Sequence, residues 1–108
     1  MYSQQDIDKV KDVILNHVVN ADSILLFGSY ARGTANQSSD MDFAVIIDSE
    51  IDRKEKLKLL GDIRWDIAVL GYNADVMIKE KRKFLNEITL PTMARVIHNE
   101  GKFIWTKT

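Results

Sequence analysis

A chain of 108 residues is long enough for one domain with one hydrophobic core. Hydrophobic residues make up 45% of it and charged residues 29%, which is typical of a folded globular protein and excludes a disordered chain. The formal net charge of -1 lacks the basic excess of nucleic-acid binders, so we do not expect nucleic acid as a partner. The absence of cysteine excludes disulfides, thiol nucleophiles and cysteine metal sites.

The sequence carries no sign of a membrane segment or of an export signal. No apolar run approaches the roughly 20 residues that a membrane-spanning helix needs. Residues 1–6 lack the basic start and the apolar core of a signal peptide. We therefore expect a cytoplasmic protein in which residues 1–108 form a single domain without membrane contact.

The first predicted element is a helix over residues 4–19. Ser3 and Asp6 have the spacing of a capping box, in which each side chain accepts a hydrogen bond from the backbone of the other. Apolar residues then recur at helical spacing and predict one inward face. These residues are Ile7, Val10, Val13, Ile14 and Val18.

Two short strands follow, separated by a polar loop. Residues 23–27 are mostly apolar and predict a buried strand, which the Gly-Ser turn at residues 28–29 ends. Residues 30–32 predict one helical turn, and residues 33–39 a loop. The second strand is predicted over residues 41–48.

The second strand places two carboxylates on one face. Side chains alternate between the faces of a strand, so Asp40 and Asp42 point the same way, about 7 Å apart. The same face of the strand continues with the apolar residues Ala44 and Ile46, which indicates that other parts of the fold cover it and that it is not open to water.

The middle of the chain predicts a long helix and a third strand. Asp52 and Glu55 repeat the capping pattern and open the helix, which Gly71 ends. A strand over residues 74–78 carries Asp75 near its start. The predicted inward stripe of the long helix is Leu57, Leu60, Ile63, Ile67 and Leu70.

The C-terminal part predicts two helices and an edge strand. Residues 79–88 favour a short helix, and the last helix begins at residues 89–91, because Pro91 suits a first turn. Its inward residues are Met93, Val96 and Ile97. Gly101 ends it, and residues 103–105 predict an edge strand. Strands separated by helices indicate an α+β domain, with a small mixed β-sheet and helices packed on it.

Asp75 brings a third carboxylate to the end of the sheet where Asp40 and Asp42 lie. Carboxylates this close repel one another unless ion pairs, solvent or a bound cation relieve their charge. The alternative is that these aspartates bind nothing and either lie in solvent at the start of a strand or cap a helix. The sequence supplies no matching basic cluster, so we expect a divalent-cation site, and oxygen ligands suit Mg²⁺.

The turn opposite these carboxylates has the features of a phosphate site. Gly28 and Ser29, placed after a strand, present backbone N–H groups and a hydroxyl, and a helical turn that begins at Tyr30 adds a favourable dipole. A phosphate cradle that faces a divalent-cation site is the arrangement that phosphoryl or nucleotidyl transfer requires.

The spacing of these residues resembles a family signature. Residues 28–29 (Gly-Ser), the ten residues 30–39 and residues 40–42 (Asp-Met-Asp) resemble the Gly-Ser-x10-Asp-x-Asp signature of the DNA polymerase β-like nucleotidyltransferase superfamily. The string at residues 28–33, Gly-Ser-Tyr-Ala-Arg-Gly, is similar to its small prokaryotic branch, the minimal nucleotidyltransferases (MNT). These are encoded beside HEPN-domain partners as toxin–antitoxin pairs. The resemblance covers essentially the whole chain and implies the polymerase β-like fold.

The resemblance also implies a role for each site residue. Residues 28–29 would contact the triphosphate of ATP, while Asp40 and Asp42 would hold two Mg²⁺ ions. Asp75 would ligate the catalytic ion and help to deprotonate the acceptor hydroxyl. Arg32 lies where a phosphate contact is expected, with a surface ion pair as the equal alternative.

The function that the resemblance implies is that of an enzymatic antitoxin. It would transfer AMP from ATP, with Mg²⁺, to a tyrosine hydroxyl of a HEPN-type toxin and so neutralise that toxin. Only about 33 residues, 76–108, follow Asp75, so we expect an open active site whose acceptor arrives on another protein. Two alternatives stay open: an antitoxin that neutralises its toxin by binding alone, and nucleotidyl transfer to a small molecule such as an aminoglycoside.

Overall fold

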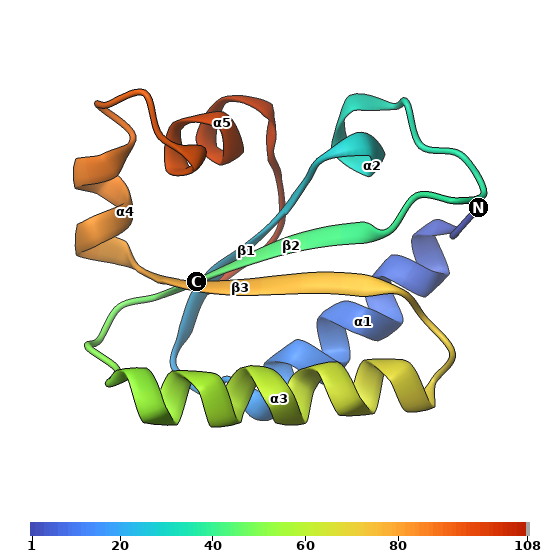
Figure 1. Ribbon diagram of the computed structural model, residues 1–108, viewed down its shortest axis with the longest axis horizontal. Coiled ribbons are helices and arrows are strands. Elements are labelled where there is room, and N and C mark those ends of the chain that lie inside the picture. Colours follow the sequence, from blue (N-terminus) through green and yellow to red (C-terminus); the bar gives the residue numbers. More distant parts are fainter. Residues whose placement is uncertain (108) are drawn as a thin grey trace.

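The computed structural model describes residues 1–107 and contains five helices and four strands over that part of the chain (Figure 1). The helices are α1 (Gln4–His17), α2 (Ser29–Arg32), α3 (Arg53–Val69), α4 (Lys81–Glu87) and α5 (Met93–Glu100). The strands are β1 (Ala21–Phe27), β2 (Met41–Ile47), β3 (Ala74–Glu80) and β4 (Lys102–Thr106). No helix within residues 1–107 is both long and apolar enough to cross a membrane.

The strands form one mixed sheet in the order β3-β2-β1-β4. β1 is antiparallel to both β2 and β4, whereas β2 and β3 are parallel. Helices α1 and α3 lie on one side of the sheet, and α2, α4 and α5 lie on the other (Figure 1). The predicted mixed sheet covered by helices is therefore confirmed, and so is the predicted edge strand near the C-terminus, which is β4.

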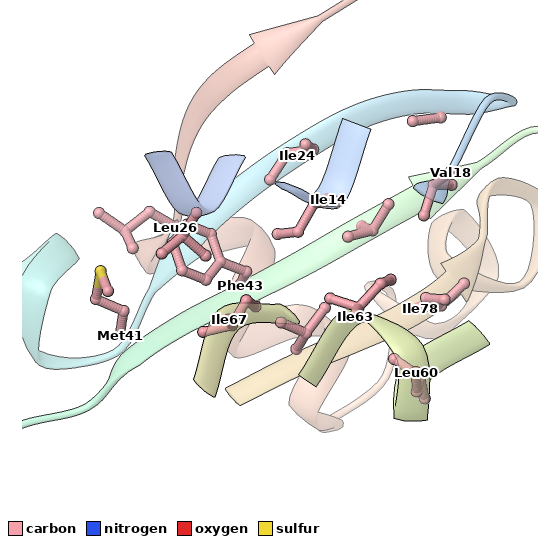
Figure 2. Close-up of a cluster of buried hydrophobic side chains, with 14 of the residues drawn as sticks. Ile14, Val18, Ile24, Leu26, Met41, Phe43, Leu60, Ile63, Ile67 and Ile78 are labelled. Carbon is pink, nitrogen blue, oxygen red and sulfur yellow. The ribbon is translucent and has the colours of Figure 1, made fainter. Parts of the chain in front are cut away.

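The larger core lies between the sheet and the α1–α3 layer. Phe43 of β2 is fully buried among Ile14 of α1 and Ile63 and Ile67 of α3 (Figure 2). Burial of a side chain of this size stabilises a fold by about 1.5–3 kcal/mol. Because most buried apolar residues belong to this core, it supplies most of the hydrophobic stabilisation.

A smaller core lies on the opposite face of the sheet, under α4 and α5. Ala44 and Ile46 of β2 pack there with Phe84 of α4 and Ile97 of α5. The predicted alternation of β2 is thus confirmed, because Phe43, Val45 and Ile47, which alternate with these residues along the strand, face the α1–α3 layer. By the same alternation, Asp42 lies on the face that carries α2, α4 and α5.

The long helix α3 begins where the sequence predicts, since the Asp52 side chain accepts a hydrogen bond from the Glu55 N–H at 2.9 Å. Its inward residues Leu60, Ile63 and Ile67 are buried. Two members of the predicted stripe are exceptions, because Leu57 is 56% and Leu70 51% exposed. Leu57 lies about a quarter of a turn from the inward direction, and Leu70 follows the end of the helix.

The start of α5 also differs from the prediction. The Thr92 hydroxyl accepts a hydrogen bond from the Arg95 N–H, so Thr92 is the N-cap and Pro91 precedes the helix. The buried residues of α5 are Ala94 and Ile97, which pack on Ala44 and Ile46 of the sheet. Met93 and Val96, which were predicted to face inward, are 58% and 44% exposed.

The cap of α1 gives the fold a testable dependence on pH. Asp6 accepts hydrogen bonds from the Ser3 N–H at 2.7 Å and from the Tyr72 hydroxyl at 2.7 Å. The Ser3 backbone bond, followed by the Tyr72 bond, lowers the pKa of Asp6. A lowered pKa stabilises the fold above the ordinary carboxyl pKa, and this contribution is lost as pH falls through the folded-state value.

Asp6→Asn is therefore expected to lower the melting temperature at neutral pH and to flatten its decline in acid. Thermal unfolding of both proteins between about pH 2 and pH 7 measures this difference, since the carboxyl titrates within that window. Parallel curves for the two proteins across the acid range would contradict the assigned role of the Asp6 carboxylate.

Candidate active site

The turn after β1 has a backbone that only glycine adopts readily. Gly28 has φ 71° and ψ -153°, a region that residues with a side chain avoid. Its carbonyl accepts the N–H groups of Ala31 and Arg32, which closes the single turn of α2. Because α2 is only one turn long, its dipole is small, and a phosphate role for this segment would depend on local groups such as Ser29.

The turn lies directly against Asp42, although fourteen positions separate Gly28 from it in the sequence. Asp42 is paired with Phe27 in the antiparallel register of β1 and β2, which brings Gly28 to the next position. A Cβ atom added to Gly28 would collide with the Asp42 carboxylate oxygen Oδ2. The glycine is therefore required both by its backbone angles and by the closeness of the carboxylate.

The structure brings the three predicted carboxylates to one end of the sheet. Asp42 and Asp75 are paired in the parallel register of β2 and β3, and neighbouring strands lie about 4.8 Å apart. Asp40 directly precedes β2 and is exposed, whereas Asp42 is partly buried. All three lie near the turn at residues 28–29, because β2 and β3 begin where β1 ends.

The charges of this group remain partly uncompensated. Loss of solvent around Asp42 raises the pKa of that carboxyl, and the nearby Asp75 and Asp40 raise it further. Arg32 acts in the opposite direction and lowers the pKa of Asp42. Together these effects raise the pKa of Asp42, so a positive charge bound at this end of the sheet would be stabilised.

The chemistry of Asp40, Asp42 and Asp75 fits a hard divalent cation, since all three supply oxygen ligands and the repulsion between their carboxylates is unrelieved. They are not drawn together into a closed cluster, and among residues 1–107 no group of three acidic, histidine or cysteine side chains is arranged to hold an ion. The exposed Asp75 side chain instead has the Arg64 guanidinium 3.8 Å away. Asp75 would have to exchange this contact for the ion.

The two remaining predicted residues also lie at this end of the molecule. Ser29 is the first residue of α2. The Arg32 guanidinium donates to the Glu100 carboxylate of α5 at 3.3 Å, which is the surface ion pair foreseen as the alternative to a phosphate contact. The charge of Arg32 nevertheless lowers the pKa of Asp42.

A hollow of about 200 Å³ lies at the opposite ends of β2 and β3, lined by residues 47–50 and 80–83. Small-molecule sites usually have volumes of about 300–1,000 Å³, so this hollow is too small for a nucleotide. It also contains none of the candidate site residues.

Three tyrosines brace the segments that carry the site, and sequence spacing gave no signal for this contact. The Tyr2 ring stacks on Tyr30 with centroids 6.0 Å apart and meets the edge of Tyr72 at 5.5 Å. The Tyr2 hydroxyl accepts the Asn73 N–H at 2.9 Å, and the Asn73 carbonyl accepts the Met41 N–H at 3.1 Å. The N-terminus thus connects the turn beside Gly28 with the starts of β2 and β3.

Substitutions of Tyr2 separate the two parts of this brace. Tyr2→Phe keeps the ring and loses the bond from Asn73, so it is expected to lower the free energy of unfolding by about 0.5–1.5 kcal/mol. Tyr2→Ala also loses the ring contacts and is expected to cost clearly more. Urea unfolding measures both values, and equal losses for the two variants would show that the ring contributes nothing.

Comparison with known proteins identifies relatives of the chain. A family model described as a nucleotidyltransferase domain matches residues 7–104. A candidate protein adenylyltransferase of Methanocaldococcus jannaschii is 30% identical over 74 residues, which cover 62% of this chain and 71% of the relative.

Solved structures share the fold at lower identity. A toxin–antitoxin complex with AMP-PNP aligns with a TM-score of 0.64 at 20% identity, over 94% of this chain and 73% of the other. A complex of tri-AMPylated HEPN toxin and MNT antitoxin from Shewanella oneidensis aligns at 0.61 and 19% identity, over 96% and 72%. Spectinomycin adenyltransferase of Enterococcus faecalis, with ATP and spectinomycin, aligns at 0.69 and 18% identity, over 99% of this chain but 57% of that enzyme.

Proposed function

Because the chain belongs to the nucleotidyltransferase domain family, we propose that it transfers AMP from ATP to a hydroxyl group of a partner protein. The observation that supports this reaction most strongly is the meeting of three features at one point. Asp42 lies against the Gly28 turn on one side and beside Asp75 on the other. Nucleotidyl transfer needs a phosphate contact directly beside a metal site.

The proposed roles follow from the position of each side chain. The turn at residues 28–29 binds the triphosphate, and Arg32 approaches it from α2. Asp40, Asp42 and Asp75 would hold Mg²⁺. When bound, Mg²⁺ neutralises phosphate oxygens and makes the acceptor hydroxyl easier to deprotonate.

In the proposed reaction the acceptor oxygen forms a bond to the α-phosphorus of ATP. The bond between the α-phosphorus and the oxygen that bridges to the β-phosphate breaks, and pyrophosphate leaves. Asp75 takes the proton of the acceptor hydroxyl, since its exposed side chain can reach an incoming group. The partly buried Asp42 keeps its position against the turn, where its carboxylate would hold the ion beside the phosphates.

We propose a toxin of the HEPN type as the partner and a tyrosine as the acceptor. Two of the three solved structures described above are toxin–antitoxin complexes, and one of them contains an AMPylated toxin. The exposed positions of Asp40 and Asp75 favour a large acceptor, because a protein surface can approach them directly. The relative from Methanocaldococcus jannaschii supports a protein acceptor as well.

Transfer to a small molecule is the second candidate, and the fold shared with spectinomycin adenyltransferase favours it. The chain spans little more than half of that enzyme's length. Modification of purified aminoglycosides or spectinomycin in the absence of any protein partner would support this candidate instead.

The experiment mixes the protein with ATP, Mg²⁺ and the purified product of the adjacent gene. We expect mass spectrometry to find AMP on a tyrosine of that product, and no AMP when Asp42→Asn replaces the wild-type protein. An unmodified product would contradict the proposal. Neutralisation of the toxin by Asp42→Asn as well as by the wild type would instead favour an antitoxin that acts by binding alone.

A further inference from the structure

The outer side of α3 carries apolar residues that no other segment of residues 1–107 covers. Leu57 is 56%, Trp65 71% and Val69 69% exposed. They follow one another at intervals of four or eight residues, which places them along one side of the helix. Figure 1 shows α3 at the outside of its layer, with only one side turned towards the sheet and α1.

The neighbouring helix α1 shows that this surface is unusual. Both helices cover the same face of the sheet, yet the exposed positions of α1 are polar. They are Gln4, Gln5, Lys9, Asp12 and Asn16. A helix at the surface of a monomer normally has such a polar outer side, and a row of large exposed apolar residues marks a contact site.

Gly61 lies midway between Leu57 and Trp65 of this row, four residues from each. A Cβ atom at Gly61 would meet nothing within 4 Å, so the outer side of α3 is bare at this point. Glycine weakens a helix interior relative to alanine, and the conformation here does not require it. A bare position in the middle of an apolar row allows another helix to approach closely.

Two of the exposed charges beside the row, Lys58 and Asp62, complement each other between antiparallel copies. Lys54 and Lys58 lie on the N-terminal side of Gly61, and Asp62 lies on its C-terminal side. When a second α3 runs in the opposite direction and crosses at Gly61, Lys58 of each copy comes close to Asp62 of the other. The same crossing brings Leu57 of each copy against Trp65 of the other.

We propose that two copies of this chain associate through α3 as an antiparallel, two-fold symmetric pair that crosses at Gly61. A two-fold pair uses the same surface on both copies, which fits Leu57 and Trp65 at equal distances on either side of Gly61. Most of the candidate active site is on the opposite face of the sheet, and α3 reaches it through the Arg64 guanidinium, 3.8 Å from Asp75. The inference does not depend on the proposed enzymatic function.

The pair should be weak. A helix of 17 residues is about 25 Å long, and one helix from each copy covers less than the roughly 800 Å² per partner of a standard interface. We therefore expect monomer at low micromolar concentration and an increasing share of dimer as the concentration approaches millimolar.

Sedimentation equilibrium over this range tests the proposal. The wild type should approach twice the monomer mass of 12.4 kDa. Gly61→Gln should weaken association by at least about tenfold, the factor that 1.4 kcal/mol of lost contact gives. The same variant should melt at a higher temperature, because glutamine favours a helix more than glycine does, so misfolding cannot explain the loss. Val19→Gln, at an apolar residue that is 94% exposed outside α3, is the control and should associate like the wild type.

Exchange of the two charges tests the orientation. Lys58→Asp and Asp62→Lys each place like charges opposite one another and should weaken association, whereas the double variant should restore it. A wild type that stays monomeric throughout, a dimer unaffected by Gly61→Gln, or a double variant weaker than both single ones would each overturn the proposal.

Discussion

Gly28→Ala is expected to lower the rate of nucleotidyl transfer at least about a hundredfold, the effect that a displacement of about 1 Å has in an active site. The new Cβ atom would occupy the position of the Asp42 carboxylate oxygen, so either the turn or the aspartate has to move. The backbone angles of Gly28 add strain of about 1–3 kcal/mol for a residue with a side chain. The change therefore affects the proposed phosphate contact and the proposed metal ligand together.

Gly33→Ala is the matched control for this variant. Gly33 also has a positive φ, 77°, but a Cβ atom there would meet nothing within 4 Å. We expect Gly33→Ala to lose about 1 kcal/mol of stability from its backbone and to keep its transfer rate. Label transferred from ATP to the partner gives the rates, and urea unfolding gives the stabilities. Equal rates for the two variants would show that the closeness of Gly28 to Asp42 has no catalytic importance.

Asp42→Asn is expected to have opposite effects on stability and on function. Burial and the neighbouring Asp75 and Asp40 raise the pKa of Asp42. A carboxyl with a raised pKa destabilises the fold once it is ionised, and stability recovers as pH falls through the folded-state pKa. At neutral pH, and without divalent cations, the variant should therefore melt a few degrees above the wild type, while its transfer activity should be abolished.

Thermal unfolding with and without MgCl₂ tests this expectation separately from activity. The wild type should gain stability from Mg²⁺, since the ion relieves the repulsion, and Asp42→Asn should gain little. Asp12→Asn changes an exposed aspartate of α1 and is the control, with the same Mg²⁺ response as the wild type. A variant that melts below the wild type without Mg²⁺ would contradict the assigned repulsion.

Local patterns predicted most of the fold. The alternation of β2 located Asp42 on the correct face, and the cap at Asp52 located the start of α3. Such features depend on neighbours within a few residues, so the sequence displays them directly. The predicted start of α5 was wrong because it rested on Pro91, whereas the hydroxyl of Thr92 forms the cap.

Contacts between distant segments could not be predicted in the same way. The sequence predicted that Asp75 and the turn lie near Asp42, but the exact register of Asp42 with Asp75 and the close approach of Gly28 depend on how the strands align. The contacts of Tyr2 with Asn73 join residues 71 positions apart. No spacing in the chain encodes them, because they arise only when α1, the turn and the start of β3 pack together.

Two samples of ATP, labelled at the α-phosphate and at the γ-phosphate, separate adenylyl transfer from phosphoryl transfer. Each is incubated with the protein, Mg²⁺ and the product of the adjacent gene. If Gly28, Ser29 and the three aspartates form a nucleotidyl-transfer site, the α label becomes attached to the acceptor protein and the γ label is released as pyrophosphate. Attachment of the γ label, or of neither label, would contradict that function.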